Sequence, residues 1–253
     1  MITFEKGLLK VQVYPTTEEM GKAAATAVAA KIGELLEKKE ELNMIFAAAP
    51  SQSSFLKSLT EDCDVEWNRI NAFHMDEYIG IDRSMVQSFG NFLYRSIFSK
   101  VPFKTVNYIN GVADDVEIEC ERYAKLLDEH PVDIVCLGIG ENGHIAFNDP
   151  AFALFNDPKM VKVVELDDVC RNQQVHEKCF PVLEKVPKQA ITLTIPALLR
   201  ADWMFCIVPF PNKAQAVKRM LQGEISQQCP ASILRKKENS VLYLNSESAS
   251  LLD

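Results

Sequence analysis

The 253-residue sequence contains no apolar run that approaches the ~20 residues of a membrane-spanning helix. Its first residues, MITFEKGLLKVQVYP, lack the basic segment and the long apolar stretch of a signal peptide. It also has no linker rich in proline, glycine and serine, no internal repeat and no low-complexity segment. These absences predict a soluble, cytoplasmic protein without a membrane partner, folded as a single domain over residues 1–253.

Basic charge is also scarce. The chain has 27 Lys and Arg against 35 Asp and Glu, and its formal net charge is −8. The basic residues are scattered rather than clustered, which argues against a nucleic-acid or membrane-surface binder. An anionic small molecule remains possible, because it needs only one local basic site.

Paired metal ligands are missing as well. None of the seven cysteines has CxxC spacing, so the sequence predicts free thiols in a reducing compartment and no zinc site. A metal site could be drawn from His74, Asp76, His144 and Asp149, but no ligand spacing supports it. We therefore expect no bound metal.

What the chain does have is an alternation of strand-like and helix-like segments, which predicts an α/β fold with a mostly parallel sheet covered by helices on both faces. The strand-like segments are 8–14, 42–49, 67–75, 106–110, 133–139, 159–166, 190–195, 203–208 and 241–245. The helix-like segments are 20–39, 86–100, 116–130 and 212–223. Ligands of such sheets bind beyond the carboxyl ends of the strands, so those positions are candidates for a site.

The segment AAAPSQSSF (47–55) follows one of these strands. Small residues and hydroxyls before a helix, here Ala49 and Ser51, can cradle a phosphate with backbone N–H groups. The segment has no glycine, however, and Pro50 removes one donor. A serine-rich turn that caps a helix is an equally good interpretation.

The segment FHMDEYIGI (73–81) places Asp76 and Glu77 where the next strand should end. The flanking aromatic residues suggest a partly shielded carboxylate, which can be tuned as a base near neutral pH. The alternatives are a solvated turn or an ion pair with Arg69 or Arg83.

The segment GIGENGHIAFNDP (138–150) follows the most clearly buried strand. Its glycines allow unusual backbone turns, and His144 could shuttle a proton there, oriented by Asp149 or Glu141. The pattern is not GxGxxG, so a dinucleotide site is not expected. The alternative is a capped loop with a structural histidine.

Two basic residues, Arg171 and Lys213, stand at other strand ends. Each alone could be an ordinary surface residue. If both reach one crevice, they would form a clamp for a phosphate.

Several motifs in this order resemble the glucosamine-6-phosphate deaminase (isomerase) family from about residue 40 to the end. They are FHMDEYIGI, QSFGNFLYRSIF, GIGENGHIAFNDP, CRNQQ, VPKQAITLTI and NKAQAVKRMLQGEIS. The resemblance implies a Rossmann-like three-layer sandwich without a cofactor. It also implies conversion of an aminosugar 6-phosphate to a ketose 6-phosphate and ammonia.

The resemblance implies roles for individual residues. Asp76 would move a proton between C2 and C1 of the sugar, and His144 would open the pyranose ring. Asn142 and Asp149 would orient His144. The remaining substrate and phosphate contacts would be Ala49, Ser51, Glu77, Arg171 and Lys213.

The chain departs from the family pattern at three points: AAPSQ replaces the usual TGGTP loop, Asp149 a glutamate and Asn142 an aspartate. These changes leave open whether glucosamine 6-phosphate or galactosamine 6-phosphate is the substrate. A sugar-phosphate lactonase and a non-catalytic sugar-phosphate sensor are the alternatives. The expected partner is a small sugar phosphate, a homo-oligomer is possible, and residues 147–185 could close as a lid.

Overall fold

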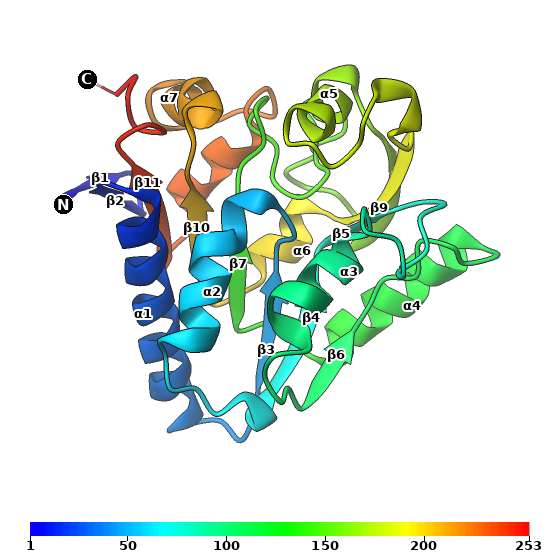
Figure 1. Cartoon of the computed structure of the whole chain (residues 1–253), viewed down its shortest axis with the longest axis horizontal. Coiled ribbons are helices and arrows are strands. Elements are labelled where there is room, and N and C mark those ends of the chain that lie inside the picture. The colour runs from blue at the N-terminus through cyan, green and yellow to red at the C-terminus, as the bar shows by residue number, and fades with distance from the viewer. Residues whose placement is uncertain (253) are drawn as a thin grey trace.

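The core of the fold is an eight-stranded sheet, seen in the computed structural model, which describes residues 1–252 (Figure 1). Only β1 runs antiparallel to its neighbour, so the expected mostly parallel sheet is confirmed. Across the sheet, the strands are β1 (Ile2–Lys6), β2 (Leu9–Tyr14), β11 (Ser240–Asn245), β10 (Trp203–Val208), β7 (Ile134–Leu137), β3 (Leu42–Phe46), β4 (Ile70–His74) and β6 (Thr105–Asn107).

A second, antiparallel sheet was not foreseen from the sequence. Its strands, in order, are β5 (Asp76–Tyr78), β9 (Gln189–Leu193) and β8 (Val161–Glu165). The sequence predicted β8 and β9 as strands, but β-rich composition does not reveal which strand pairs with which. It missed β5 because the predicted strand 67–75 ends at Met75, and the acidic residues that follow were expected at the end of that strand or in a turn.

Helices cover the main sheet on both faces, as expected. The α-helices are α1 (Thr17–Leu36), α2 (Ser53–Glu61), α3 (Phe89–Leu93), α4 (Val116–Glu129), α5 (Asp168–His176), α6 (Ile195–Leu199) and α7 (Ala214–Gln222). Shorter 3₁₀ turns are η1 (Pro50–Gln52), η2 (Trp67–Arg69), η4 (Leu183–Lys185), η5 (Pro211–Lys213) and η6 (Pro230–Lys236), and η3 (Tyr94–Phe98) is π-helical. Over residues 1–252, no helix is both long and apolar enough to cross a membrane.

Side chains alternate between the two faces along each central strand, as the two-residue period of a strand requires. In β3, Met44 and Phe46 point to the face covered by α1 and α2, and Ile45 points to the opposite face. All three side chains are fully buried. Central strands buried on both sides appear in the sequence as continuous apolar runs, which is why β3, β7 and β10 could be predicted.

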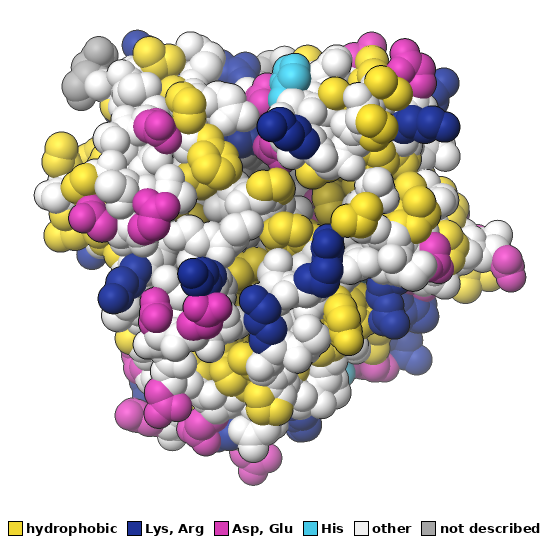
Figure 2. Space-filling model, in the orientation of Figure 1, with side chains coloured by type: hydrophobic (Ala, Val, Ile, Leu, Met, Phe, Trp, Pro, Cys, Tyr) yellow, Lys and Arg dark blue, Asp and Glu magenta, His cyan; other side chains and the backbone are white. Residues whose placement is uncertain are grey.

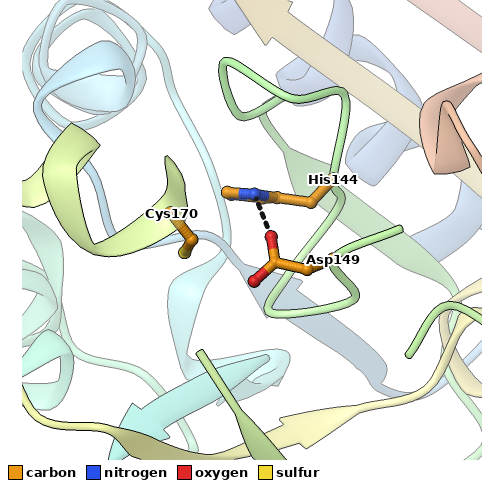
Figure 3. Close-up of side chains that lie close together, drawn as sticks. All are labelled: His144, Asp149 and Cys170. Atoms are coloured by element: carbon orange, nitrogen blue, oxygen red, sulfur yellow. Dashed lines mark ion pairs between the residues drawn. The ribbon is translucent and has the colours of Figure 1, made fainter. Parts of the chain in front are cut away.

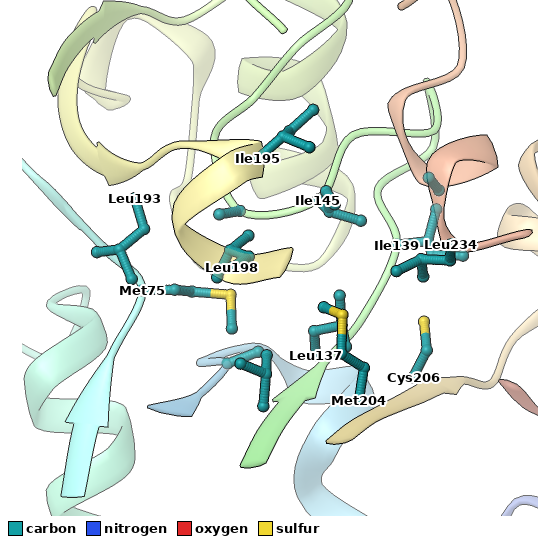
Figure 4. Close-up of a cluster of buried hydrophobic side chains, with 14 of the residues drawn as sticks. Met75, Leu137, Ile139, Ile145, Leu193, Ile195, Leu198, Met204, Cys206 and Leu234 are labelled. Atoms are coloured by element: carbon teal, nitrogen blue, oxygen red, sulfur yellow. The ribbon is translucent and has the colours of Figure 1, made fainter. Parts of the chain in front are cut away.

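The opposite face joins the main sheet to the small one. Figure 4 shows Met75, between β4 and β5, and Leu193, the last residue of β9, in one apolar cluster with Leu137 at the end of β7 and Leu198 of α6. The N–H of Leu193 also donates to the carbonyl of Met75 over 2.8 Å. This shared core fixes the small sheet beyond the carboxyl ends of the main strands.

Two glycines within α1 provide a test of this packing. A Cβ at Gly33 would meet nothing within 4 Å, whereas a Cβ at Gly21 would clash with Ser54 and lie 2.9 Å from the backbone N of Phe55. We expect Gly33→Ala to raise the free energy of unfolding by about 0.5–1 kcal/mol, because alanine favours the helix. Gly21→Ala should lower it, because α1 and α2 must separate. Equal shifts in urea titrations of the two variants would contradict the close contact between these helices.

Candidate functional site

A cavity of about 640 Å³ opens at the carboxyl ends of β3, β4, β7 and β10. In the space-filling view, this face is hollowed near its middle, with hydrophobic side chains in the hollow and Lys and Arg side chains beside it (Figure 2). Five of the residues predicted for the site line the cavity: Ala49, Ser51, Asp76, His144 and Lys213. The position agrees with the rule that parallel sheets bind ligands at this end.

Asp76 lies at the joint where the chain leaves the main sheet and enters the small one. It is the first residue of β5 and is paired with Thr192 of β9. Its carboxyl group faces the cavity but is only 7% exposed, and no hydrogen bond from residues 1–252 reaches it. Burial raises the pKa of Asp76 well above its ordinary value, and the neighbouring Glu77 raises it further. When ionised, such a carboxylate is a stronger base than an exposed one.

His74 supports the backbone of this joint. Its Nε2 accepts a hydrogen bond from the N–H of Ile109 over 2.9 Å, so Nδ1 carries the proton and donates to the carbonyl of Asp76 over 3.0 Å. Burial lowers the pKa of His74 to about 4. Both ring nitrogens are therefore occupied by backbone groups, and the metal site drawn from the sequence with His74 is not formed.

Glu77 does not line the main cavity, although the family resemblance placed it among the substrate contacts. Its carboxylate accepts hydrogen bonds from the backbone N–H groups of Tyr78, Phe89 and Gly90 and from the hydroxyl of Ser88, over 2.7–3.1 Å. It thus caps the first turn of α3. Burial still raises the pKa of Glu77 despite these donors. Within the described chain, neither of the two arginines considered from the sequence pairs with it.

The imidazole of His144 lies against the carboxylate of Asp149 in the loop after β7 (Figure 3). Nδ1 of His144 lies 2.8 Å from Oδ1 of Asp149, and the Asn142 amide donates to the same oxygen over 2.8 Å. Asn142 also accepts from the backbone N–H of His144 over 2.9 Å. Burial by itself would raise the pKa of Asp149, but His144 and Asn142 stabilise the carboxylate and hold that pKa below its usual range.

The glycines of this loop are needed for the imidazole to lie where it does. A Cβ at Gly140 would overlap the ring atoms of His144, so the ring packs directly against backbone. Gly143 has φ +92°, a conformation that side chains disfavour, and a Cβ there would lie 2.8 Å from Sγ of Cys229. The sequence prediction of an unusual turn is confirmed at Gly143 and that of a close backbone approach at Gly140, whereas Gly138 and Gly140 do not adopt a positive φ.

Cys170 was not predicted from the sequence as a site residue. The sequence gives no indication of such a role except that Cys170 precedes Arg171. Cys170 lies beside Asp149 in Figure 3, and one ligand atom from each of His144, Asp149 and Cys170 falls within 4.8 Å of the others. Burial raises the pKa of the Cys170 thiol well above its usual value, and the charges of Asp149 and Asp167 raise it further. His144, Asp149 and Cys170 thus form one buried cluster of polar side chains.

The two basic residues predicted from the sequence have different surroundings. Lys213 is buried and lines the cavity, with Nζ 3.0 Å from Oε1 of Glu177. Arg171 does not line the cavity, because its guanidinium pairs with Asp168 over 3.1 Å and donates to the carbonyl of Leu183 over 2.8 Å. The structure therefore does not bring both into one crevice, and a phosphate contact by Arg171 stays a prediction.

The glycine-free segment after β3 begins a helical turn. Pro50 occupies the first position of η1, where a missing N–H is tolerated. Gln52, which was missed from the sequence, donates to the carbonyl of Ile207 over 3.1 Å and to the hydroxyl of Ser51 over 3.2 Å. Its side-chain oxygen is buried without a partner in the described chain. Both Ser51 and Gln52 line the cavity and offer it polar atoms.

Comparison with known proteins shows similarity over nearly the whole chain. A sequence profile of the family described as glucosamine-6-phosphate isomerases/6-phosphogluconolactonase matches residues 15–243. A glucosamine-6-phosphate deaminase of Bacillus cereus (strain B4264) is 33% identical over 243 residues, which cover 96% of this chain and 89% of that protein.

Solved structures show the same similarity. A monomeric glucosamine-6-phosphate deaminase superposes with a TM-score of 0.85 at 30% identity, over 95% of this chain and 99% of that one. A 6-phosphogluconolactonase from Thermotoga maritima superposes with a TM-score of 0.75 at 20% identity, over 93% of this chain and 98% of that one. The second similarity shows a shared fold, and the expected Rossmann-like α/β architecture is confirmed.

The surroundings of His74 can be tested by long-range ¹H–¹⁵N NMR. We expect its ring to stay neutral, with the proton on Nδ1, from about pH 8 to about pH 5, because burial disfavours the charged form. A His74→Gln variant assigns the signals. A ring that gains charge near pH 6.5, the ordinary value for histidine, would contradict the hydrogen bonds described for this residue.

Proposed function

Because this chain belongs to the family of glucosamine-6-phosphate isomerases and 6-phosphogluconolactonases, we propose that it is an aminosugar-6-phosphate deaminase. It would convert glucosamine 6-phosphate, or its galactosamine epimer, to a ketose 6-phosphate and ammonia. The observation that carries this proposal is the buried carboxyl group of Asp76, which faces the cavity and has no partner in the described chain. One domain over residues 1–253 would carry the whole activity.

Asp76 would act as the base of the isomerisation. Moving a proton from C2 to C1 requires removal of a weakly acidic C–H proton next to the open-chain carbonyl. A carboxylate shielded from water does this well, since its raised pKa brings its basicity closer to neutral pH. The same carboxyl group can then deliver the proton to C1. The imine left at C2 reacts with water to give the ketone and ammonia.

His144 would open the sugar ring before that step. Ring opening removes a proton from the C1 hydroxyl and returns one to the ring oxygen, which suits an imidazole facing the cavity. The contact with Asp149, and the hydrogen bonds of Asn142 to Asp149 and to the backbone of His144, would hold the ring in one orientation. Asn142 and Asp149 would thus position His144 without touching the substrate themselves.

Lys213 and the segment after β3 would bind the phosphate. Lys213 supplies the buried positive charge in the cavity, and Ala49 and Ser51 line the same space from η1. Binding at the phosphate positions the reacting carbons, which raises the rate without any new contact at C1 or C2. Because the loop AAPSQ differs from the usual family sequence TGGTP, both glucosamine 6-phosphate and galactosamine 6-phosphate are candidate substrates.

Lactone hydrolysis is the second candidate, because solved 6-phosphogluconolactonases share the fold at low sequence identity. Such a reaction would use His144 to activate water and would not need Asp76. A sugar-phosphate sensor without catalysis would need neither group. The proposed enzyme would act in the cytoplasm on a small sugar phosphate, and its assembly as a homo-oligomer stays a prediction.

The first test follows ammonia and ketose 6-phosphate release from glucosamine 6-phosphate and galactosamine 6-phosphate in parallel. We expect turnover of one epimer, and a loss on the order of 10²–10⁴-fold in kcat for Asp76→Asn, because the base is removed. The variant should unfold at the same or a higher temperature, since an unpaired buried carboxylate destabilises a fold. The matched control is Asp114→Asn, at an exposed position outside the cavity.

Two results would decide against the deaminase. Release of ammonia that is unaffected by Asp76→Asn would remove Asp76 from the mechanism. Hydrolysis of 6-phosphogluconolactone that survives this substitution, without any release of ammonia, would favour the lactonase.

The pH dependence gives a second test. Asp76 must lose its proton to act as a base, so kcat/KM should rise as pH increases through its pKa. Because that pKa is raised, the acidic limb should lie well above the ordinary value of 3.8. Titration of ¹³C-labelled aspartate carboxyl groups should show one resonance with the same midpoint that is absent in Asp76→Asn. A midpoint at the ordinary value for that resonance would contradict the proposed environment.

A further inference from the structure

The positive charge of Lys213 is already neutralised within the cavity. Its Nζ lies 3.0 Å from Oε1 of Glu177, and the two side chains are only 2% and 10% exposed. Both residues line the cavity. The carboxylate of Glu177 therefore stands at the position where an anionic group of a ligand would contact Lys213.

Glu177 is held there by a second donor. The amide of Gln173, one turn earlier in α5, donates to the same Oε1 over 2.9 Å. The carbonyl oxygen of the Gln173 side chain accepts from the backbone N–H of Glu141 over 2.9 Å, which fixes the amide. An ammonium and an amide N–H that converge on one oxygen form a pair of donors that also suits a phosphate oxygen.

The position of Glu177 in the chain allows its side chain to move away from Lys213. Glu177 caps the C-terminus of α5, and the next residue, Lys178, adopts a left-handed conformation with φ +59°. In the described chain, the hydrogen bonds to the Glu177 carboxylate come from the side chains of Gln173 and Lys213, so its movement would break no backbone hydrogen bond of α5 or of a sheet. Lys178 also lines the cavity and adds positive charge near the place that Glu177 would leave.

We propose that Glu177 is a specificity-determining residue that occupies the anion position at Lys213 in the free protein. The phosphate of a substrate then has to displace this carboxylate before it can contact Lys213. The inference rests on the proposed function only in taking the ligand to be a sugar phosphate. It adds that binding is an exchange of one anion for another.

Electrostatic repulsion determines which ligands can displace the Glu177 carboxylate from Lys213. Two anions cannot share one buried ammonium without strong repulsion, because charges in a partly buried site are poorly screened. A phosphate dianion carries two charges and three free oxygens, so it replaces a carboxylate more readily than a monoanion or a neutral sugar does. Glu177 would thus weaken the binding of all anions, and monoanions most.

The experiment measures binding of inorganic phosphate by calorimetry at constant pH and ionic strength. The Glu177→Gln variant keeps the size of the side chain but removes its charge. We expect it to bind phosphate on the order of ten-fold more tightly than the original protein, because the competing anion is gone. The matched control, Glu184→Gln in η4, removes an exposed acidic residue outside the cavity and should leave the affinity unchanged.

Three further variants complete the design. Lys213→Met should abolish phosphate binding, and adding Glu177→Gln to it should not restore binding. Glu177→Asp, whose carboxylate reaches less far, should bind phosphate with an affinity between those of the original protein and Glu177→Gln. It keeps the inference testable if the glutamine variant does not fold. In turnover assays, Glu177→Gln should lower KM for the sugar phosphate more than it changes kcat.

Unchanged or weaker phosphate binding by a folded Glu177→Gln would overturn the inference. Failure of the proposed function would look different, because phosphate binding is read without turnover. If the protein releases no ammonia but its Glu177→Gln variant binds phosphate more tightly, the result supports the inference and contradicts the proposed deaminase. If the protein releases ammonia but Glu177→Gln does not bind phosphate more tightly, the result supports the deaminase and contradicts the inference.

Discussion

The site depends on a single unpaired carboxyl group at the joint between two sheets. Asp76 is the first residue of β5, directly beyond the end of β4, and faces the cavity without a hydrogen-bond partner in the described chain. A buried group of this kind destabilises the fold, so the structure around it must be held by other interactions. The antiparallel pairing of β5 with β9 and the apolar core in Figure 4 provide them.

The ionisable groups next to Asp76 are bound to backbone groups, whereas in the described chain the carboxyl group of Asp76 has no such partner. His74 uses both ring nitrogens on main-chain groups, and Glu77 accepts four hydrogen bonds, three of them at the start of α3. These three ionisable residues lie within four positions of the sequence. Their different surroundings assign them different roles, and only the one that faces the cavity suits catalysis.

The sequence predicted what depends on local pattern and missed what depends on pairing between distant segments. The buried strand β7 and the glycine-rich turn around His144 were predicted, because an apolar run indicates a buried strand and glycines indicate a turn from the local sequence alone. The small sheet was not, since β5 is three residues long and finds its partner more than 100 positions later. Arg171 was expected beside Lys213, but a sequence does not show that Asp168 and a carbonyl already bind it. The contact of Glu177 with Lys213 could not be predicted either, because it forms only in the folded chain.

Three acidic side chains at the site illustrate how surroundings decide function. Asp149 is buried, but His144 and Asn142 stabilise its carboxylate and lower its pKa, which fits the orienting role proposed for it. The carboxylate of Glu177 is held by Lys213 and Gln173, which is why we propose that it competes with an anionic ligand. Asp76 has no such stabilisation, and its raised pKa is the direct consequence. These surroundings give three carboxyl groups different properties, and the roles proposed for them, an orienting group, an internal anion and a base, follow from those differences.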